Sequence, residues 1–231
     1  MSNMNAVLML LTTLAIPAAA VAQVGHGPES SPYRELMSKQ AASVVTGYLW
    51  GSQGRVNVGP SNGPLAGIRY EHAIGTPADI QIGLSFAHLE RMSIDPAKPV
   101  ATRITGPISQ DIVMMETGLS LVLMGRKTWH GFSPFIGGNL GVAFETGLGG
   151  TDPYQYGTKA IFAPHIGFKW YPVQQFSLKV EGRDYFWRLS YPPQYSTGVG
   201  GLPAVLPAGD PGTEWTMHPT LMFSIGYTFT R

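Results

Sequence analysis

Between Ala42 and Phe229 the chain contains eight strand-length segments whose connections alternate between short and long. The short connections lie at residues 75–79, 125–132 and 172–175, and the long ones, mostly rich in Gly, Pro, Ser and Asn, at 52–63, 90–110, 146–158 and 190–214. Tight turns at one end and larger loops at the other are typical of a transmembrane β-barrel, with the short turns on the periplasmic side. This alternation of short and long connections predicts the architecture and the location of the protein, but it does not indicate a biochemical activity.

Each segment has about the 9–11 residues that a tilted strand needs to cross a bilayer. We therefore predict an all-β fold, an eight-stranded antiparallel up-and-down transmembrane β-barrel. The predicted strands are 42–51, 64–74, 79–90, 111–124, 133–146, 158–171, 176–189 and 215–229. The 190–214 connection carries five prolines and several glycines, so we expect it to be the largest and most mobile external loop.

Apolar and small or polar residues alternate along the strands. In the eighth strand Leu221, Phe223 and Ile225 share one face, whereas Met222 and Ser224 share the other. The apolar faces would contact lipid, and the small and polar faces would line a narrow interior. Aromatic residues are expected at two interfacial levels: Tyr48, Trp50, Tyr185 to Trp187 and Trp215 at the outer one, and Phe132, Trp170, Tyr171, Tyr227 and Phe229 at the inner one.

The N-terminus has the pattern of a secretory signal peptide. An apolar stretch from Ala6 to Ile16 precedes Ala20-Val21-Ala22, which fits an A-x-A cleavage site before Gln23. We predict a cleavable signal peptide at 1–22, a periplasmic N-terminal extension at 23–41 with one helical turn around Arg34 to Gln40, and the barrel at 42–231. The alternative is an uncleaved anchor, because the first five residues contain no Lys or Arg.

Composition excludes several classes of function. A formal net charge of +1 provides no basic field for nucleic acid, so we expect no nucleic-acid partner. The absence of cysteine excludes disulfides and thiolate metal sites, and no two histidines have ligand spacing. We therefore predict no metal, no cofactor and no catalytic residue.

Three stretches carry a resemblance to a known family. They are Ser133-Pro-Phe-Ile-Gly-Gly-Asn-Leu-Gly-Val-Ala-Phe-Glu145, Ala163-Pro-His-Ile-Gly-Phe-Lys-Trp-Tyr171, and Phe176-Ser-Leu-Lys-Val-Glu-Gly-Arg183. With them the chain resembles the small eight-stranded outer-membrane barrels of the OmpA transmembrane-domain and OmpX type. The resemblance implies a bacterial outer-membrane location, reached by export through the periplasm, with outer-membrane lipid and lipopolysaccharide around the barrel. The last strand, Ser224 to Phe229, looks like the signal that such proteins present to the barrel-assembly machinery, although Thr230 and Arg231 follow it.

A set of charged residues occupies those strand positions whose side chains are expected to point into the barrel. These residues form the main candidate site. Four acids and four bases suggest neutralised ion pairs, because an isolated charge in a confined interior is costly. The predicted lumen charge network is Arg69, Glu71, Glu116, Glu145, Lys169, Lys179, Glu181 and Arg183, with Asn139 and His165 beside it. We interpret it as a structural plug. A small gated pore is the alternative, but eight strands are too few for an open aqueous channel.

A lipid-modifying enzyme of the lipid A deacylase kind is the other alternative. Gly83 to Ala87 nearly matches a nucleophile elbow, but it lies in mid-strand and ends in Ala. His88 and Glu90 are both expected to face lipid near the outer rim of the barrel, because they are two residues apart on one strand. They lack the His-x-Ser pairing expected of a deacylase. A third alternative is a soluble lipocalin-like barrel, which would place the apolar faces inside.

From these observations we predict a non-enzymatic barrel with a structural or surface-interaction role through its external loops and an unknown extracellular ligand.

Overall fold

The computed structural model describes residues 31–147 and 152–229, and the barrel lies within the compact unit Pro32–Arg231. The predicted signal peptide and residues 23–30 of the predicted extension lie outside the described residues. The strands are β1 (Tyr33–Glu35), β2 (Gln40–Leu49), β3 (Gly63–Ala73), β4 (Ala78–Ile94), β5 (Ile104–Val122), β6 (Lys127–Trp129), β7 (Phe132–Glu145), β8 (Thr158–Val173), β9 (Phe176–Ser190) and β10 (Thr213–Phe229), and α2 (Gln194–Thr197) is a short helix.

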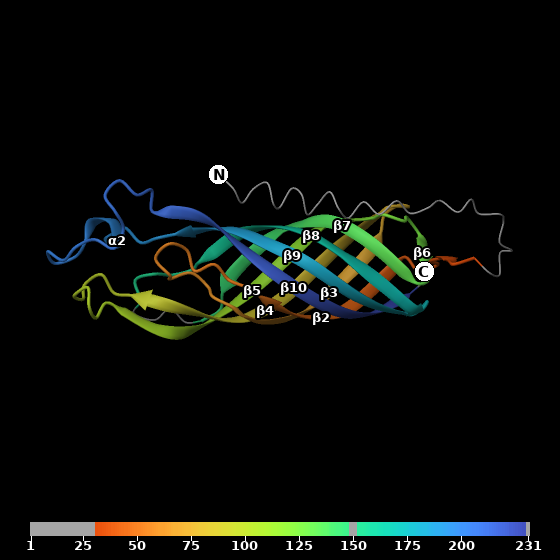
Figure 1. Ribbon diagram of the computed structural model, residues 1–231, viewed down its shortest axis with the longest axis horizontal. Coiled ribbons are helices and arrows are strands. Elements are labelled where there is room, and N and C mark those ends of the chain that lie inside the picture. Colours follow the sequence, from red (N-terminus) through yellow and green to blue (C-terminus); the bar gives the residue numbers. More distant parts are fainter. Residues whose placement is uncertain (1–30, 148–151, 230–231) are drawn as a thin grey trace, which may run out of the picture. The chain divides into compact units, whose positions relative to one another are not determined.

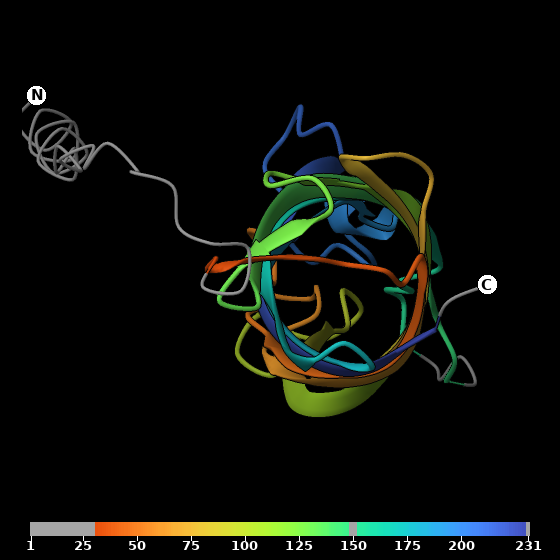
Figure 2. The same cartoon turned by 90° about the vertical axis from the view of Figure 1, so that its right-hand side faces the viewer.

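Eight of these strands close into a ring (Figures 1 and 2). Each pairs antiparallel with its neighbours in the order β2-β3-β4-β5-β7-β8-β9-β10, and β10 pairs back with β2 from Thr220 opposite Leu49 to Phe229 opposite Gln40. Because the ring closes, each of its eight strands has a neighbour on both sides and none is an edge strand. The predicted all-β, eight-stranded, antiparallel up-and-down barrel is confirmed.

Two strands are longer than the sequence pattern predicts. The expected loop at 90–110 shrinks to 95–103, because β4 and β5 continue as a hairpin to Ile94 opposite Ile104, with an irregularity between Arg91 and Ser93. Pairing of β5 with β7 ends at Ile112 opposite Glu145, so residues 104–111 have a ladder on one side only. A proline is tolerated at such an edge, which explains how Pro107 fits within β5.

The predicted helical turn around Arg34 to Gln40 is wrong. Tyr33–Glu35 instead form β1, which pairs with β6 inside the connection between β5 and β7. Residues 36–39, here called the strap, then cross the end of the ring where the short turns lie (Figure 2). The Arg126 guanidinium donates to the backbone carbonyl oxygens of Leu36 and Ser38. A strand and a bridging arginine satisfy strap backbone groups that a helix would have bonded internally.

The barrel is apolar outside and polar inside. Along β10, Leu221, Phe223 and Ile225 are exposed, whereas Met222 and Ser224 are buried in the lumen. A soluble lipocalin-like barrel would have the reverse arrangement, so the outer surface is that of a membrane-spanning barrel. No helix in the described part of the chain is long and apolar enough to cross a membrane.

The aromatic belts are confirmed only in part. Tyr48, Trp50 and Trp215 are exposed near the ends of their strands on the long-loop side, as predicted. Tyr185 and Trp187 are fully buried in the lumen instead, because their strand places odd-numbered residues inward. Tyr171 likewise lines the lumen mouth near the strap. These three side chains fill the interior and do not contact lipid.

Candidate functional site

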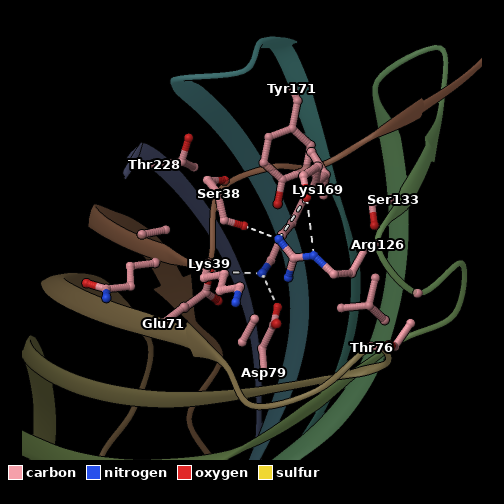
Figure 3. A pocket seen from close by; sticks show the side chains of 16 residues that line it. Ser38, Lys39, Glu71, Thr76, Asp79, Arg126, Ser133, Lys169, Tyr171 and Thr228 are labelled. Atoms are coloured by element: carbon pink, nitrogen blue, oxygen red, sulfur yellow. Dashed lines mark hydrogen bonds and ion pairs between the residues drawn. The ribbon is translucent and has the colours of Figure 1, made fainter. Parts of the chain in front are cut away.

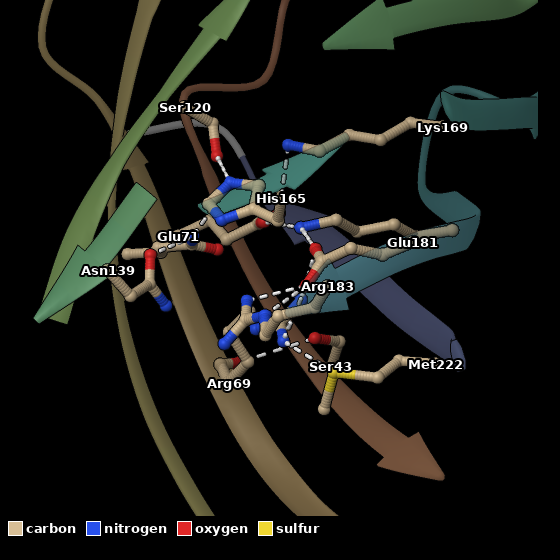
Figure 4. Close-up of polar contacts among 12 residues, drawn as sticks. Ser43, Arg69, Glu71, Ser120, Asn139, His165, Lys169, Glu181, Arg183 and Met222 are labelled. Carbon is tan, nitrogen blue, oxygen red and sulfur yellow. Dashed lines mark hydrogen bonds and ion pairs between the residues drawn. The ribbon is translucent and has the colours of Figure 1, made fainter. Parts of the chain in front are cut away.

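The half of the lumen nearer the short turns contains a continuous chain of ion pairs (Figure 4). Glu181 is its hub and is completely buried. It contacts Arg69 Nη1 at 3.0 Å, Lys179 Nζ at 2.8 Å and Arg183 Nη2 at 2.5 Å. Arg183 also pairs with Glu116 from the strand across the ring. One carboxylate therefore holds three cations from two separate strands.

The chain of ion pairs continues toward the strap. Lys179 Nζ lies 2.8 Å from Glu71 Oε1, and Lys169 Nζ lies 2.9 Å from Glu71 Oε2. Lys169 also contacts Asp79 Oδ2 at 3.0 Å. Two lysines thus share Glu71, and the network reaches the mouth of the lumen without a break.

The structure brings together seven of the eight predicted lumen charges. Glu145, the eighth, lies at the end of β7 and makes no ion pair within residues 31–147 and 152–229. Asp79 takes its place, so four acids still balance four bases. Sequence reasoning missed Asp79, although its position two before the buried Gln81 gives it inward parity.

Uncharged polar side chains form hydrogen bonds with one another beside the ion-pair network. His165 Nε2 lies 3.0 Å from Ser120 Oγ and 3.3 Å from Gln81 Nε2, and Gln81 also contacts the Asn139 side chain. A Ser–His contact is a nucleophile–base geometry, but both residues are buried deep in the lumen, out of reach of a substrate. Among the described residues no group of three or more His, Cys, Asp or Glu could hold a metal ion.

Two glycines of β7 make room for this network. A Cβ atom at Gly137 would collide with the Leu119 carbonyl oxygen and the His165 ring, and one at Gly141 would collide with the Met115 carbonyl oxygen and press on Glu116. Each glycine thus leaves space for a polar side chain of the network and for the backbone of the neighbouring strand.

The other half of the lumen, toward the long loops, is apolar. Trp187 stacks on His218 with 3.8 Å between ring centroids and meets Tyr156 edge-on. Around them pack Leu49, Leu65, Leu89, Ile112, Met114 and Leu189. His218 is fixed because its Nδ1 accepts a hydrogen bond from the Ser52 backbone N–H at 3.0 Å. This half of the lumen is a hydrophobic core.

A small polar cavity lies between the strap and the charge network (Figure 3). It holds about 40 Å³, room for only a few water molecules. Its lining combines Ser38 and Lys39 of the strap with Lys169 and Asp79 of the charge network (Figure 3). The strap therefore covers this mouth of the lumen.

The four long loops close the opposite end as a packed cap. Its core consists of Val58, Ile94, Tyr154, Tyr191, Tyr195 and Leu206, with Val56 and Val205 against it. The 191–212 loop is the longest, as predicted, but Tyr195 and Leu206 are buried; its mobility stays a prediction. Burial raises the pKa of Tyr195 above its usual range, so its phenol stays neutral and donates to the Ile94 carbonyl oxygen at 2.9 Å.

Ion pairs and hydrogen bonds join the loops of this cap. Arg55 of the first loop pairs with Asp210 of the fourth at 2.9 Å. Arg91, at the end of β4, pairs with Asp152 of the third loop at 2.5 Å. Arg103 of the second loop donates to the Pro203 carbonyl oxygen at 3.3 Å. These ion pairs and this hydrogen bond hold the loops of the cap together.

His88 has a partner that the sequence did not reveal. Its Nδ1 lies 2.6 Å from Asp111 Oδ1 on the outer face of the β4–β5 pair. The rung before it joins Phe86 and Val113, and the rung after it joins Glu90 and Ser109. This His–Asp pair is thus the first polar rung beyond the apolar band of these two strands.

No protein-family model matches the sequence, and no curated protein matches it either. Several solved structures are similar. The outer membrane protein OprG from Pseudomonas aeruginosa is 9% identical with a TM-score of 0.48, and the match covers 84% of this chain and 98% of that one. Neisserial surface protein A is 12% identical with a TM-score of 0.47, over 86% of this chain and 98% of that one.

A third similar structure is the N-terminal β-barrel domain of OprF from Pseudomonas aeruginosa. It is 9% identical with a TM-score of 0.45, over 83% of this chain and 98% of that one. Identities this low transfer no activity or partner to this chain. The closed eight-stranded ring is established by the strand pairing of the chain itself.

Proposed function

We propose that this protein is a closed outer-membrane barrel that presents a folded external surface and conducts no solutes. An outer-membrane location is supported by the exposed apolar band, by the alternation of short turns and long loops, and by the export signal expected at residues 1–22. With the short turns on the periplasmic side, the strap lies on the periplasmic side and the cap lies outside the cell.

The observation that carries this proposal is the continuous filling of the lumen. The strap covers the periplasmic mouth, the ion-pair network fills the next level, and the apolar core around Trp187 fills the outer half. The external cap then closes the far end. A solute would have to displace charged, aromatic and loop residues in succession to cross.

The cap is the part of the protein best suited to a surface interaction. Its loops are held by their own core and by the pairs Arg55–Asp210 and Arg91–Asp152. A preordered surface loses less conformational entropy when it binds a partner than a flexible loop does. Within it, the tip of the second loop is exposed at Lys98 and Val100. We place the contact with an extracellular partner on this side.

Planar-bilayer recording tests the closed lumen. Purified protein should insert, as shown by its heat-modifiable migration on a gel, and should give no stable conductance step above that of the bare bilayer. A large, ion-selective conductance that is stable and changes its selectivity with Lys179→Glu would contradict the proposal and identify a pore. Protein denatured before reconstitution serves as the control for insertion.

Hydrolysis of an outer-leaflet lipid ester is the second candidate function, favoured by the His88–Asp111 contact at 2.6 Å. A carboxylate that orients a histidine is part of a general-base arrangement, and Ser109 lies on the same face one rung away. If this activity exists, His88→Ala should abolish release of fatty acid from lipid vesicles, whereas Lys98→Ala should not. Equal release by the parent and His88→Ala would exclude this site as its source.

A further inference from the structure

The lipid-facing wall has a hollow beside Trp50, where β8, β9 and β10 meet. The hollow has a volume of about 480 Å³ and is lined mainly by Trp50, Pro164, Ile166, Gly182 and Pro219. Gly182 explains it, because a Cβ atom there would meet nothing closer than the Ile166 carbonyl oxygen at 3.9 Å. Gly182 of β9 lies directly between its cross-strand partners Ile166 of β8 and Leu221 of β10. Because glycine has no side chain, the space between those two side chains is empty.

One carboxylate lies in this apolar hollow. Asp184 belongs to the lipid-facing set of β9 and pairs with Pro219 of β10. The side chain is partly exposed and interacts with the His218 backbone N–H, but its Oδ1 is buried and has no hydrogen-bond partner within the described ranges. A buried acceptor with no donor is unfavourable, and most of all in an apolar setting. This oxygen therefore points to a ligand that supplies an O–H or N–H donor.

The neighbours of Asp184 define its depth. Trp50, an exposed residue of the outer aromatic belt, lies beside it and donates its backbone N–H to the Pro219 carbonyl oxygen at 2.8 Å. Two rungs beyond Asp184 on the same face, Arg188 is exposed, with Nη2 donating to Thr213 Oγ1. From the membrane outward, the wall thus offers an apolar hollow, an acceptor and a cation.

This order matches one class of lipid. Glycerophospholipids carry only acceptor ester oxygens at the level where their acyl chains begin. A phosphorylated glucosamine lipid with hydroxylated acyl chains, the lipid A type, carries hydroxyl and amide N–H donors there and phosphate above. Asp184 can accept from such a donor, and the Arg188 guanidinium suits a phosphate.

We propose that this hollow is a selective binding site for an acyl chain of a lipid A-type glycolipid. Its acyl chain fills the space above Gly182, its hydroxyl or amide group donates to Asp184, and its phosphate contacts Arg188. The inference rests on the proposed outer-membrane location and orientation, since such lipids occupy the outer leaflet.

Native mass spectrometry of the detergent-solubilised protein tests the site. The probes are purified lipid A and, separately, phosphatidylglycerol of matching chain length. The parent should retain lipid A in preference to phosphatidylglycerol. Loss of one hydrogen bond to a charged group in Asp184→Leu should reduce that preference about tenfold or more. Gly182→Leu, which fills the hollow, should remove retention of both lipids at this site.

Ala66→Leu is the matched control, because Ala66 is a small lipid-facing residue on β3, away from the hollow. It should bind like the parent, and heat-modifiable migration verifies the fold of every variant. Asp184→Asn, which keeps the shape and an acceptor oxygen, should show an intermediate preference and guards against misfolding of the leucine variant.

Three outcomes would overturn the proposal. Equal retention of both lipids by the parent would make the hollow a general lipid contact, and a preference unchanged in Asp184→Leu would place selectivity elsewhere. A dimer that Gly182→Leu dissociates would make it a subunit interface. Because these measurements are made in detergent, they are independent of conductance and of cell fractionation, so failure of this site and failure of the proposed function are distinguishable.

Discussion

Replacing Glu181 with alanine should lower the free energy of unfolding by about 3–5 kcal/mol, because it leaves buried cations without their shared carboxylate. Arg69, Lys179 and Arg183 all contact Glu181, and none of the three is more than slightly exposed. Reversible urea unfolding in lipid vesicles measures the change. Bilayer recording of the same variant should still show little conductance, because the apolar half of the lumen is unchanged.

Glu145→Ala is the matched control for this effect. Glu145 has the same inward parity in the sequence, but it lies at the end of β7, outside the ion-pair network of the described residues. We expect its loss to change the unfolding free energy by less than about 1 kcal/mol. If both substitutions had equal effects, the network would not be the source of the stability.

Replacing Trp187 with alanine should destabilise the barrel by about 3–5 kcal/mol, the usual cost of removing a buried large aromatic side chain. Trp187 is completely buried, stacks on His218 and contacts Tyr156 edge-on. Its removal leaves a cavity in the apolar half of the lumen. The same unfolding experiment measures the loss.

Phe186→Ala provides the comparison, because Phe186 is adjacent in the chain but belongs to the lipid-facing set of β9. Mobile lipid chains refill the space outside the barrel, so this variant should lose clearly less stability. A greater loss for Phe186→Ala than for Trp187→Ala would mean that the outer aromatic belt, and not the filled lumen, dominates stability.

Much of the candidate site could be predicted because side-chain direction in a strand has a period of two residues. The alternation of side chains along a strand alone predicted that Arg69, Glu181 and Arg183 point into the barrel, and in the structure all three are buried. Parity also applies to Tyr185 and Trp187, but their aromatic character outweighed it in the prediction of an outer belt. The error came from grouping three consecutive residues that alternate between two faces.

The contacts themselves could not be predicted. Glu116 and Arg183 are on strands that are not neighbours in the ring, and they meet only because the curved sheet brings opposite walls together. Asp79 replaces Glu145 because the network lies in the half of the lumen near the short turns. The depth of each residue depends on the stagger between strands, which closure of the ring determines.

By itself, the sequence determined the eight strands, their antiparallel order, the apolar outer face and most of the inward charges, because each of these follows from local periodicity and turn composition. Only the tertiary structure decided the register, the ion pairs, the strap across one mouth, the packed cap over the other, and the hollow beside Asp184. These features join residues far apart in the chain, and their positions depend on how the strands shift against one another when the barrel closes.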